Sequence, residues 1–517
     1  MPVELVSAPE TITTQSLGTT ASQTTAVPRL ETTAPETTAP SLETTATPFH
    51  RTAQVLHTAE NSSTVQSSGG RRRRQQPLWE KMAPTATIAA DILNASFFDA
   101  LRNIRNGSIG LKKECDELYG HTMLRNHQNL SHEVCTGSGA MSNVYCLERK
   151  PYQARRFLCV FANAQLVSYN ASNRQPGNLA THDARFAVDC ARPGAGKGRT
   201  GKDLPWDFWQ RYTMKTIQYQ SRLSCLNVVE HNVLLYPLWS GPDGKNFYEF
   251  MHDFLSLFEA LLVLNWNPVD VEAMLPNIKG PGAYTAPFFG MVERTFALRG
   301  LRYKDSWFPT GTCFRRLALP PTPGASSLTV YGGRRGKVRC RSPVLSAVAE
   351  FTRRLYQEEL GEYSEQRWVT LMHRAWSRKN DRYMNSEAIA REVETEIWKN
   401  DTIRAWNLTS MSYDPIGKDL AVGIHTMSRT ILLAGVHGAG LTHALFLPSG
   451  AVLLEIFCAD RDISNGHYMT IAAQLGLRYA SNPPKDYQSN CSKVGRPNIS
   501  RLILRNLPTP HPTDKKS

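Results

Sequence analysis

One segment constrains the fold of this chain more than any other: LLAGVHGAGLTHALFLPSGAVLLEIF, residues 432–457. No formal charge occurs between Thr430 and Leu454, an apolar length sufficient for a transmembrane helix. Such a helix would have to continue through Pro448, Ser449 and Gly450, which together form a turn signal. We therefore predict a strand, a glycine turn, a short helix and a second strand.

The predicted unit is of the βαβ type. Residues 431–437 form the short, continuously apolar run typical of a buried parallel strand. Residues 439–447 are predicted to form the helix and residues 451–457 the second strand, with Glu455 near its carboxyl end. Ligands of such sheets bind beyond the carboxyl ends of the strands.

The glycine turn, residues 438–440, has two interpretations. Exposed N–H groups at the start of the helix, together with the helix dipole, attract phosphate. Alternatively, the glycines only allow helix and strand to pack closely. A second segment favours the first interpretation, because residues 368–372 predict a strand that leads into a basic loop and then a helix opened by Asn385. The loop contains Arg374, Arg378, Lys379 and Arg382.

Three other readings of the glycine-rich motifs are weaker. The turn lacks the third glycine of a dinucleotide fingerprint, where His443 stands instead. The His-Gly-rich loop of lipases would need a Gly-x-Ser-x-Gly elbow, and the chain has none. The GAGKGRTGK segment, residues 194–202, has Gly198 where a phosphate loop needs Ser or Thr for magnesium.

The first 70 residues differ from the rest. They are rich in Thr, Ser and Pro, repeat Glu-Thr-Thr-Ala, and hold six Glu against two Arg. Such a segment cannot bury enough apolar surface to offset its ordering entropy, so we expect a disordered, stalk-like tail. The basic run at residues 71–74 is typical of a solvated linker.

The basic excess lies in the remainder of the chain, because the formal net charge of the whole is +14. A basic globular region suits nucleic acid, anionic membrane or phosphorylated small molecules. The sequence lacks an aromatic-rich RNA-binding signature, zinc-finger spacing and a basic helix leading into heptads. We therefore expect no nucleic-acid partner.

Cysteines and glycosylation sequons indicate the compartment. Ten cysteines are present without a Cys-x-x-Cys pair, which leaves disulfides or buried thiols rather than a zinc site. Nine Asn-x-Ser/Thr sequons, at Asn61, Asn94, Asn106, Asn129, Asn170, Asn400, Asn407, Asn490 and Asn498, favour the secretory-pathway lumen (Golgi or endoplasmic reticulum). The N-terminus shows no signal peptide or anchor, so membrane association would need an anchor not visible here.

Three segments resemble the core of glycosyltransferase family 61. They are GVHGAGLTHALFLPSGAVLLEIF, the upstream SRKNDRYMN and the downstream YMTIAAQLGLRYAS. The resemblance runs in order from about Cys225 to Leu507, and HGAGLT followed by FLP-GA is its most specific part.

The resemblance implies an α/β fold of the GT-B type, with two facing Rossmann-like domains. Residues 105–345 would form the acceptor-side domain and residues 346–507 the nucleotide-sugar domain. Residues 1–104 would form the disordered tail and linker, and residues 508–517 a second tail. The implied activity is inverting transfer of GlcNAc, xylose or arabinose from a UDP-sugar to a hydroxyl of a protein or polysaccharide, without a metal or another cofactor.

The resemblance also implies the site residues. Arg378 and Arg382 would meet the diphosphate of the donor, helped by the turn formed by Gly438, Ala439, Gly440 and Thr442. His437 would face the donor from the end of its strand. We place Glu455, on geometry alone, at the ribose hydroxyls.

The catalytic base is less determined. Single-displacement inversion needs a group that takes the proton of the acceptor hydroxyl. Segment GKNFYEFMHDFLSLFEALL resembles the family's Asn-x-x-His-x-x-x-Asp pattern through Asn246 and Asp253, but Glu249 occupies the histidine position. Asp253, Glu249 and neighbouring His252 are the candidates, against the simpler reading that these are solvated or capping groups.

Two rival functions stay open. Asp460 and Asp462 follow an apolar strand, as the Asp-x-Asp metal site of a GT-A transferase does. The departure at Glu249 also allows a non-enzymatic protein of the same fold that binds glycans or polyanions. Transfer or hydrolysis of a donor separates an enzyme from a binding protein.

Overall fold

A computed structural model of the chain describes most of residues 86–508. The described residues are 86–135, 141–149, 156–171, 182–190, 217–236, 238, 246–276, 278, 280, 287–320, 328, 340–357, 366–373, 384–401, 407–415, 419–457, 466–482 and 496–508. The predicted tail, residues 1–70, and the basic run at 71–74 lie outside them.

The N-terminal half is built on a nine-stranded mixed sheet. Its strands are β1 (Ser131–Cys135), β2 (Asn143–Arg149), β3 (Arg156–Ala171), β4 (His182–Val188), β5 (Ile217–Tyr219), β6 (Asn227–Leu235), β7 (Val271–Leu275), β8 (Leu301–Tyr303) and β9 (Thr312–Leu319). The main path runs β1-β2-β3-β9-β6-β7-β8, and β4 and β5 extend it from β3. Strands β9, β6, β7 and β8 are parallel, whereas β1 to β4 form an antiparallel meander.

Helices of this half pack on one face of the sheet. They are α1 (Ala86–Ser108), α2 (Lys113–Tyr119), α3 (His121–Asn129), α5 (Phe247–Leu264), α6 (Gly290–Thr295) and α7 (Pro343–Leu355), with the short 3-10 turns η2 (Pro268–Asp270), η3 (Pro287–Phe289) and η4 (Lys304–Ser306). Helix α5 is apolar nearly all round and is buried along most of its length, as expected of a helix enclosed by other elements.

The C-terminal half contains a five-stranded parallel sheet. Its strands are β10 (Arg367–Met372), β11 (Leu408–Tyr413), β12 (Thr430–Val436), β13 (Val452–Ile456) and β14 (Arg478–Ser481). Its helices are α8 (Ser386–Lys399), α10 (Leu420–Ser428), α12 (His467–Leu475) and α13 (Arg496–Asn506), with the 3-10 helix η7 (Ala439–Phe446). The strand order is β11-β10-β12-β13-β14, the flavodoxin-like order 2-1-3-4-5 of a doubly wound sheet.

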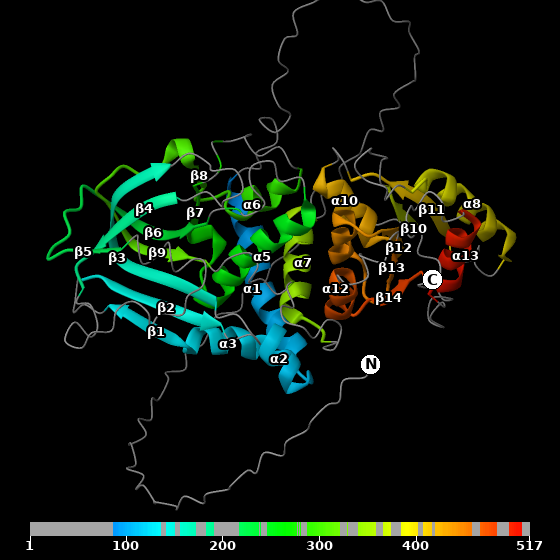
Figure 1. Ribbon diagram of the computed structural model, residues 1–517, viewed down its shortest axis with the longest axis horizontal. Helices are drawn as coiled ribbons and strands as arrows, with labels where there is room; N and C mark the ends of the chain where they lie inside the picture. The colour runs from blue at the N-terminus through cyan, green and yellow to red at the C-terminus, as the bar shows by residue number, and fades with distance from the viewer. Residues whose placement is uncertain are drawn as a thin grey trace, which may run out of the picture. The chain divides into compact units, whose positions relative to one another are not determined.

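Both faces of this sheet are covered, which explains its apolar strands. Helices α8 and α13 lie on one face and α10 and α12 on the other (Figure 1). Side chains of β12 alternate accordingly: Leu432 and Ala434 join the core under α8 and α13, while Leu433 joins the core on the opposite face. Burial on both faces is typical of parallel sheets.

The predicted strands of the motif segment are confirmed. The structure has β12 at Thr430–Val436 and β13 at Val452–Ile456, joined through the glycine turn. Strand β10 ends at Met372, and the side chain of Asn385 caps α8 by accepting from the N–H of Ala388 at 3.1 Å. The helix prediction for residues 439–447 is only partly right, because Ala439–Phe446 is a 3-10 helix rather than an α-helix.

Two expectations about the N-terminal half are corrected. Residues 86–104, assigned to the linker, belong to α1, whose Leu93, Phe97 and Ile104 are buried in the core. This amphipathic pattern was not predicted, because the segment follows the Thr-, Ser- and Pro-rich tail and was assigned to the linker. The sheet of this half is also not a purely parallel Rossmann-like sheet, because β1 to β4 follow one another as neighbours and pair antiparallel.

The expected boundary at residue 345 falls inside α7. This helix contacts α1 as well as α12 and η7, so the two halves share one continuous apolar core. Among the described residues no helix is both long and apolar enough to cross a membrane.

Four disulfides fix the N-terminal half. They join Cys115 to Cys340, Cys135 to Cys190, Cys146 to Cys159, and Cys225 to Cys313. Cys458 and Cys491 lie outside the described residues. The disulfide alternative to buried thiols is therefore confirmed for eight cysteines.

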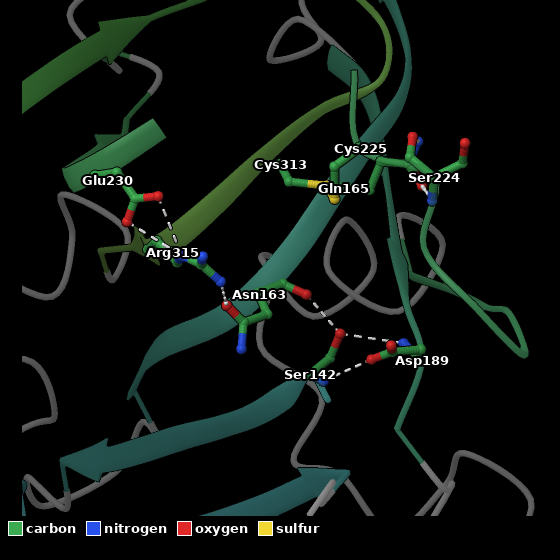
Figure 2. Close-up of a disulfide and its surroundings, with 9 residues drawn as sticks. All are labelled: Ser142, Asn163, Gln165, Asp189, Ser224, Cys225, Glu230, Cys313 and Arg315. Atoms are coloured by element: carbon green, nitrogen blue, oxygen red, sulfur yellow. Dashed lines mark hydrogen bonds and ion pairs between the residues drawn. A yellow bond between two sulfur atoms is a disulfide. The ribbon is translucent and has the colours of Figure 1, made fainter. Parts of the chain in front are cut away.

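The disulfide between Cys225 and Cys313 lies beside a row of polar contacts across three strands (Figure 2). Gln165 of β3 donates to the carbonyl of Ser224 at 2.6 Å and accepts from its N–H at 3.2 Å, directly beside Cys225–Cys313. Further along, Arg315 of β9 donates to Asn163, whose φ of 54° marks a kink in the long strand β3. A second apolar core in this half contains residues of β1 to β7 and of β9.

His443 links the two halves. Its ring lies 4.6 Å from that of Phe247 in α5 and 5.7 Å from that of Tyr413 at the end of β11. Its Nδ1–H donates to the carbonyl of Gly440 at 2.9 Å. Burial lowers the pKa of His443 to about 4, although the bond to Gly440 acts in the opposite direction. The residue that replaces the third fingerprint glycine is thus a neutral core histidine.

We predict that this histidine makes stability depend on pH. The pKa of His443 is about 4 in the folded protein, whereas the ordinary value for histidine is 6.5. The unfolded chain therefore binds the proton more readily, and stability falls as pH decreases from about 6.5 to 4. The loss should approach about 3 kcal/mol at the acid end. Urea unfolding across this range should show a smaller loss for His443→Gln, which donates to Gly440 without titrating. Parallel curves for both proteins would contradict the assignment.

Candidate active site

The doubly wound sheet determines where a ligand site can form. In such sheets ligands bind outside the carboxyl ends of the strands, at the point where the strand order reverses. Here that point lies between β10 and β12. His373 follows β10 and His437 follows β12, and the basic loop and the glycine turn continue from these two residues. The two segments singled out in the sequence therefore leave the sheet side by side.

The glycine turn also has a packing role. A Cβ at Gly435 would lie 2.8 Å from Leu441 Cδ2 and from Met372 Cβ. A Cβ at Gly440 would lie 3.0 Å from Cγ of Met372. Close approach of η7 to β10 and β12 therefore accounts for these two glycines. The outer part of the turn, residues 438–440, is half-exposed, which is compatible with a ligand-facing role for its backbone.

His437 is held by a buried carboxylate. Its Nδ1 lies 2.5 Å from Oε1 of Glu455, and the hydroxyl of Tyr479 donates to Oε2 at 2.6 Å. Both oxygens of Glu455 are thus engaged by side chains, and Glu455 is 1% exposed. A carboxylate on one imidazole nitrogen fixes the orientation of the ring and its tautomer. The ribose contact expected for Glu455 stays a prediction.

Tyr468 connects His437 to the glycine turn. Its hydroxyl donates to the carbonyl of Gly438 at 2.5 Å. The rings of Tyr468 and His437 lie 5.5 Å apart at 71°. The ring of Phe457 also stacks on that of His437, with the ring centroids 5.8 Å apart. The backbone of the turn is therefore tied to α12 as well as to β12.

The first turns of α5 reach this edge from the N-terminal half. Tyr248 Oη lies 2.7 Å from Nδ1 of His467, and its ring lies 6.1 Å from that of Tyr468. His252, one turn later, packs edge-on against Tyr248 at 4.7 Å. Asn246 caps the helix by accepting from the N–H groups of Tyr248 and Glu249. The segment that resembles the acceptor-side motif thus lies near the carboxyl ends of the C-terminal strands, where the glycine turn is found.

The candidate bases occupy different environments. Asp253 is 0% exposed and accepts from the hydroxyl of Tyr236 at 3.0 Å. Burial, and then the charge of Asp253, raise the pKa of Tyr236 well above its usual range, so that tyrosine stays a donor. Glu249 is half-buried in the first turn. It shares a helix face with Asp253, because residues four apart lie one above the other.

The remaining members of the predicted turn differ in exposure. Ala439 is half-exposed, whereas Thr442 is fully buried. The hydroxyl of Thr442 has no hydrogen-bond partner among the described residues. It points into the protein, so any contact of Thr442 with a ligand would require η7 to move.

Several predicted residues lie outside the described part of the chain. Arg378 and Arg382 fall among the residues after β10 that are not described, and Asp460 and Asp462 fall among those after β13. The GAGKGRTGK segment, residues 194–202, is likewise not described. Within the described ranges, no three His, Cys, Asp or Glu side chains are grouped as a metal would require.

Some residues of this edge were not assigned a role from the sequence. They include Tyr248, His467, Tyr468 and Tyr479. They also include His373, Ser386 and Ser412: Ser386 Oγ lies 2.9 Å from Nδ1 of His373 and 2.7 Å from Oγ of Ser412. Tyr468 and Tyr479 are the aromatic residues of the YMTIAAQLGLRYAS segment. The signal was therefore present, but the partners of these tyrosines come from distant parts of the chain.

Comparison with known proteins adds a relationship. No protein-family model matches the chain. A curated protein of similar sequence is the EGF domain-specific O-linked N-acetylglucosamine transferase of Drosophila melanogaster, which is 25% identical over 248 residues. The match covers 47% of this chain and 44% of that protein, so the chain spans less than half of its relative. The four disulfides fit an oxidising compartment such as the secretory-pathway lumen, and the similarity supports a glycosyltransferase relationship.

Proposed function

We propose that this protein is an inverting glycosyltransferase of the GT-B type. It transfers GlcNAc, xylose or arabinose from a UDP-sugar to a hydroxyl of a protein or polysaccharide acceptor, in the secretory-pathway lumen and without a metal. The observation that carries the proposal is the meeting of α5 with the glycine turn at the switch point of the five-stranded sheet, through Tyr248, His467 and Tyr468.

The donor is proposed to bind on the C-terminal half. The switch point supplies a half-exposed glycine backbone at residues 438–440, and the chain that follows β10 supplies Arg378 and Arg382. Arginine forks suit the oxygens of a diphosphate in charge and geometry. His437, oriented by Glu455, faces the donor from the end of β12.

The acceptor is proposed to bind on the N-terminal side of the same edge. In an inverting step, the acceptor oxygen attacks C1 of the sugar, the bond from C1 to the UDP oxygen breaks, and a base takes the hydroxyl proton. We place Glu249 first as the base, because it is half-buried at the start of α5 while Asp253 is fully buried and hydrogen-bonded to Tyr236. His252 is the third candidate, on the Tyr248 face.

The proposed activity predicts donor turnover that survives chelation. The secreted full chain is incubated with UDP-GlcNAc, UDP-xylose, UDP-arabinofuranose, UDP-galactose or UDP-glucose, and UDP release is measured with and without EDTA. We expect turnover of GlcNAc, xylose or arabinose donor at the same rate in EDTA. Loss of that turnover in EDTA would contradict the metal-independent reading and move the site to Asp460 and Asp462.

The base assignment predicts a contrast between two isosteric substitutions on one helix face. Glu249→Gln should lower kcat by about 10²-fold or more, because the amide cannot take the proton. Asp253→Asn should retain most of the activity, because the amide oxygen still accepts from Tyr236. Thermal unfolding of both variants controls for stability. A loss of kcat confined to Asp253→Asn would instead assign the base to Asp253.

A further inference from the structure

Two glycosylation sequons flank the connection between α8 and β11. Asn400 follows the last residue of α8, and Asn407 precedes the first residue of β11. Both side chains are exposed. Asn407 has φ of 52°, a left-handed conformation that asparagine tolerates better than most residues. Each is followed by the sequence x-Thr, through Thr402 and Thr409.

A large apolar side chain stands exposed next to the first sequon. Trp398, two residues before Asn400, is 59% exposed, which is unusual for a side chain that is highly buried on average. Its Nε1–H donates to Oε1 of Glu394 at 3.1 Å, and Oε2 of Glu394 accepts from the N–H of Ser410 in β11. The indole is therefore anchored beside the outer side of β11 rather than free to turn away.

In the described part of the structure, that outer side of β11 is the edge of the sheet. Within the described sheet β11 pairs only with β10. The carbonyls of Asn407 and Tyr413 accept from Arg367 and His373 on the β10 side. Because strand residues alternate, the backbone groups of residues 408, 410 and 412 point away from β10. Glu394 satisfies the N–H of Ser410, and no further strand pairs with this edge in the part of the chain that the structure describes.

We propose that Asn400 and Asn407 carry N-linked glycans that cover this edge, with the first sugar on Asn400 packed against the indole of Trp398. In the modification, the side-chain nitrogen of asparagine attacks C1 of an oligosaccharide held on a lipid diphosphate. The bond from C1 to the diphosphate oxygen breaks, the nitrogen loses one proton, and the lipid diphosphate leaves. The apolar C–H face of a pyranose ring complements the flat indole face, and the polar rim of the glycan keeps other strands away.

The position of these sites separates them from the candidate active site. Asn407 lies at the amino end of β11, whereas ligands of a doubly wound sheet bind at the carboxyl ends. Glycans at Asn400 and Asn407 therefore leave donor binding unaffected. The inference depends on passage through the secretory pathway but not on the transferase activity.

The test maps glycans on the full chain secreted from a eukaryotic host. The protein is digested with a protease, and the peptides are treated in ¹⁸O water with an amidase that removes each N-glycan and converts its asparagine to ¹⁸O-labelled aspartate. The labelled peptides are identified by mass spectrometry. The exposed sequons at Asn94, Asn106 and Asn129 serve as internal comparisons. We expect label at Asn400 and Asn407 in the native sequence. An unlabelled Asn400 or Asn407 overturns the proposal, whatever the other sequons show.

Matched variants separate the glycan from the side chain that is changed. Thr402→Ala and Thr409→Ala should each remove one glycan, whereas Thr402→Ser and Thr409→Ser keep both sequons. Trp398→Ala should lower occupancy at Asn400 relative to Trp398→Phe. On size-exclusion chromatography, the double alanine variant should show more oligomer than the double serine variant, with equal UDP affinity. Equal elution of the two double variants overturns the covering role.

Discussion

The close packing of η7 against both strands at the switch point is the contact on which the rest of this structure depends. Gly435 and Gly440 have no room for a Cβ beside Leu441 and Met372. This packing lets η7 contact α5, α7, α10 and α12 at once, so one short helix joins the two halves in a single core. His443 completes the joint by remaining neutral between Phe247 and Tyr413.

The same packing places the chemistry at one edge. Once η7 is seated, Gly438 and His437 emerge at the end of β12, where Tyr468 and Glu455 fix them. Helix α5 then brings Tyr248 to the same point from the other half. The positions of the side chains in this site therefore follow from helix packing. Polar side chains of the two halves meet there, as in the contact between Tyr248 and His467. This arrangement suits a reaction that joins a nucleotide-bound donor to a separate acceptor.

Local signals in the sequence were sufficient for three of the five strands of the C-terminal sheet, β10, β12 and β13. Continuous apolar runs bounded by glycine and proline turns predicted β12 and β13, and an Asn cap predicted the start of α8. The choice between α and 3-10 geometry for η7 depended on tertiary contacts and could not be read locally. Helix α1 was missed because it follows a long Thr- and Ser-rich segment. The burial of Asp253 was not predicted, although the phenylalanines and leucines around it make α5 apolar on nearly every face. The pairing of Tyr248 with His467 spans 219 residues and has no local signature.

The proposed function requires that the switch point between β10 and β12 binds a nucleoside diphosphate. Calorimetric titration of UDP into the secreted protein, its Arg378→Ala variant and an Arg391→Ala control measures this directly. Arg391 is exposed on α8 and lies outside the proposed site. We expect saturable UDP binding to the native protein and to Arg391→Ala, and an affinity at least about tenfold lower for Arg378→Ala. Equal affinity in all three proteins would contradict the placement of the diphosphate, and absence of UDP binding to the native protein would contradict the site itself.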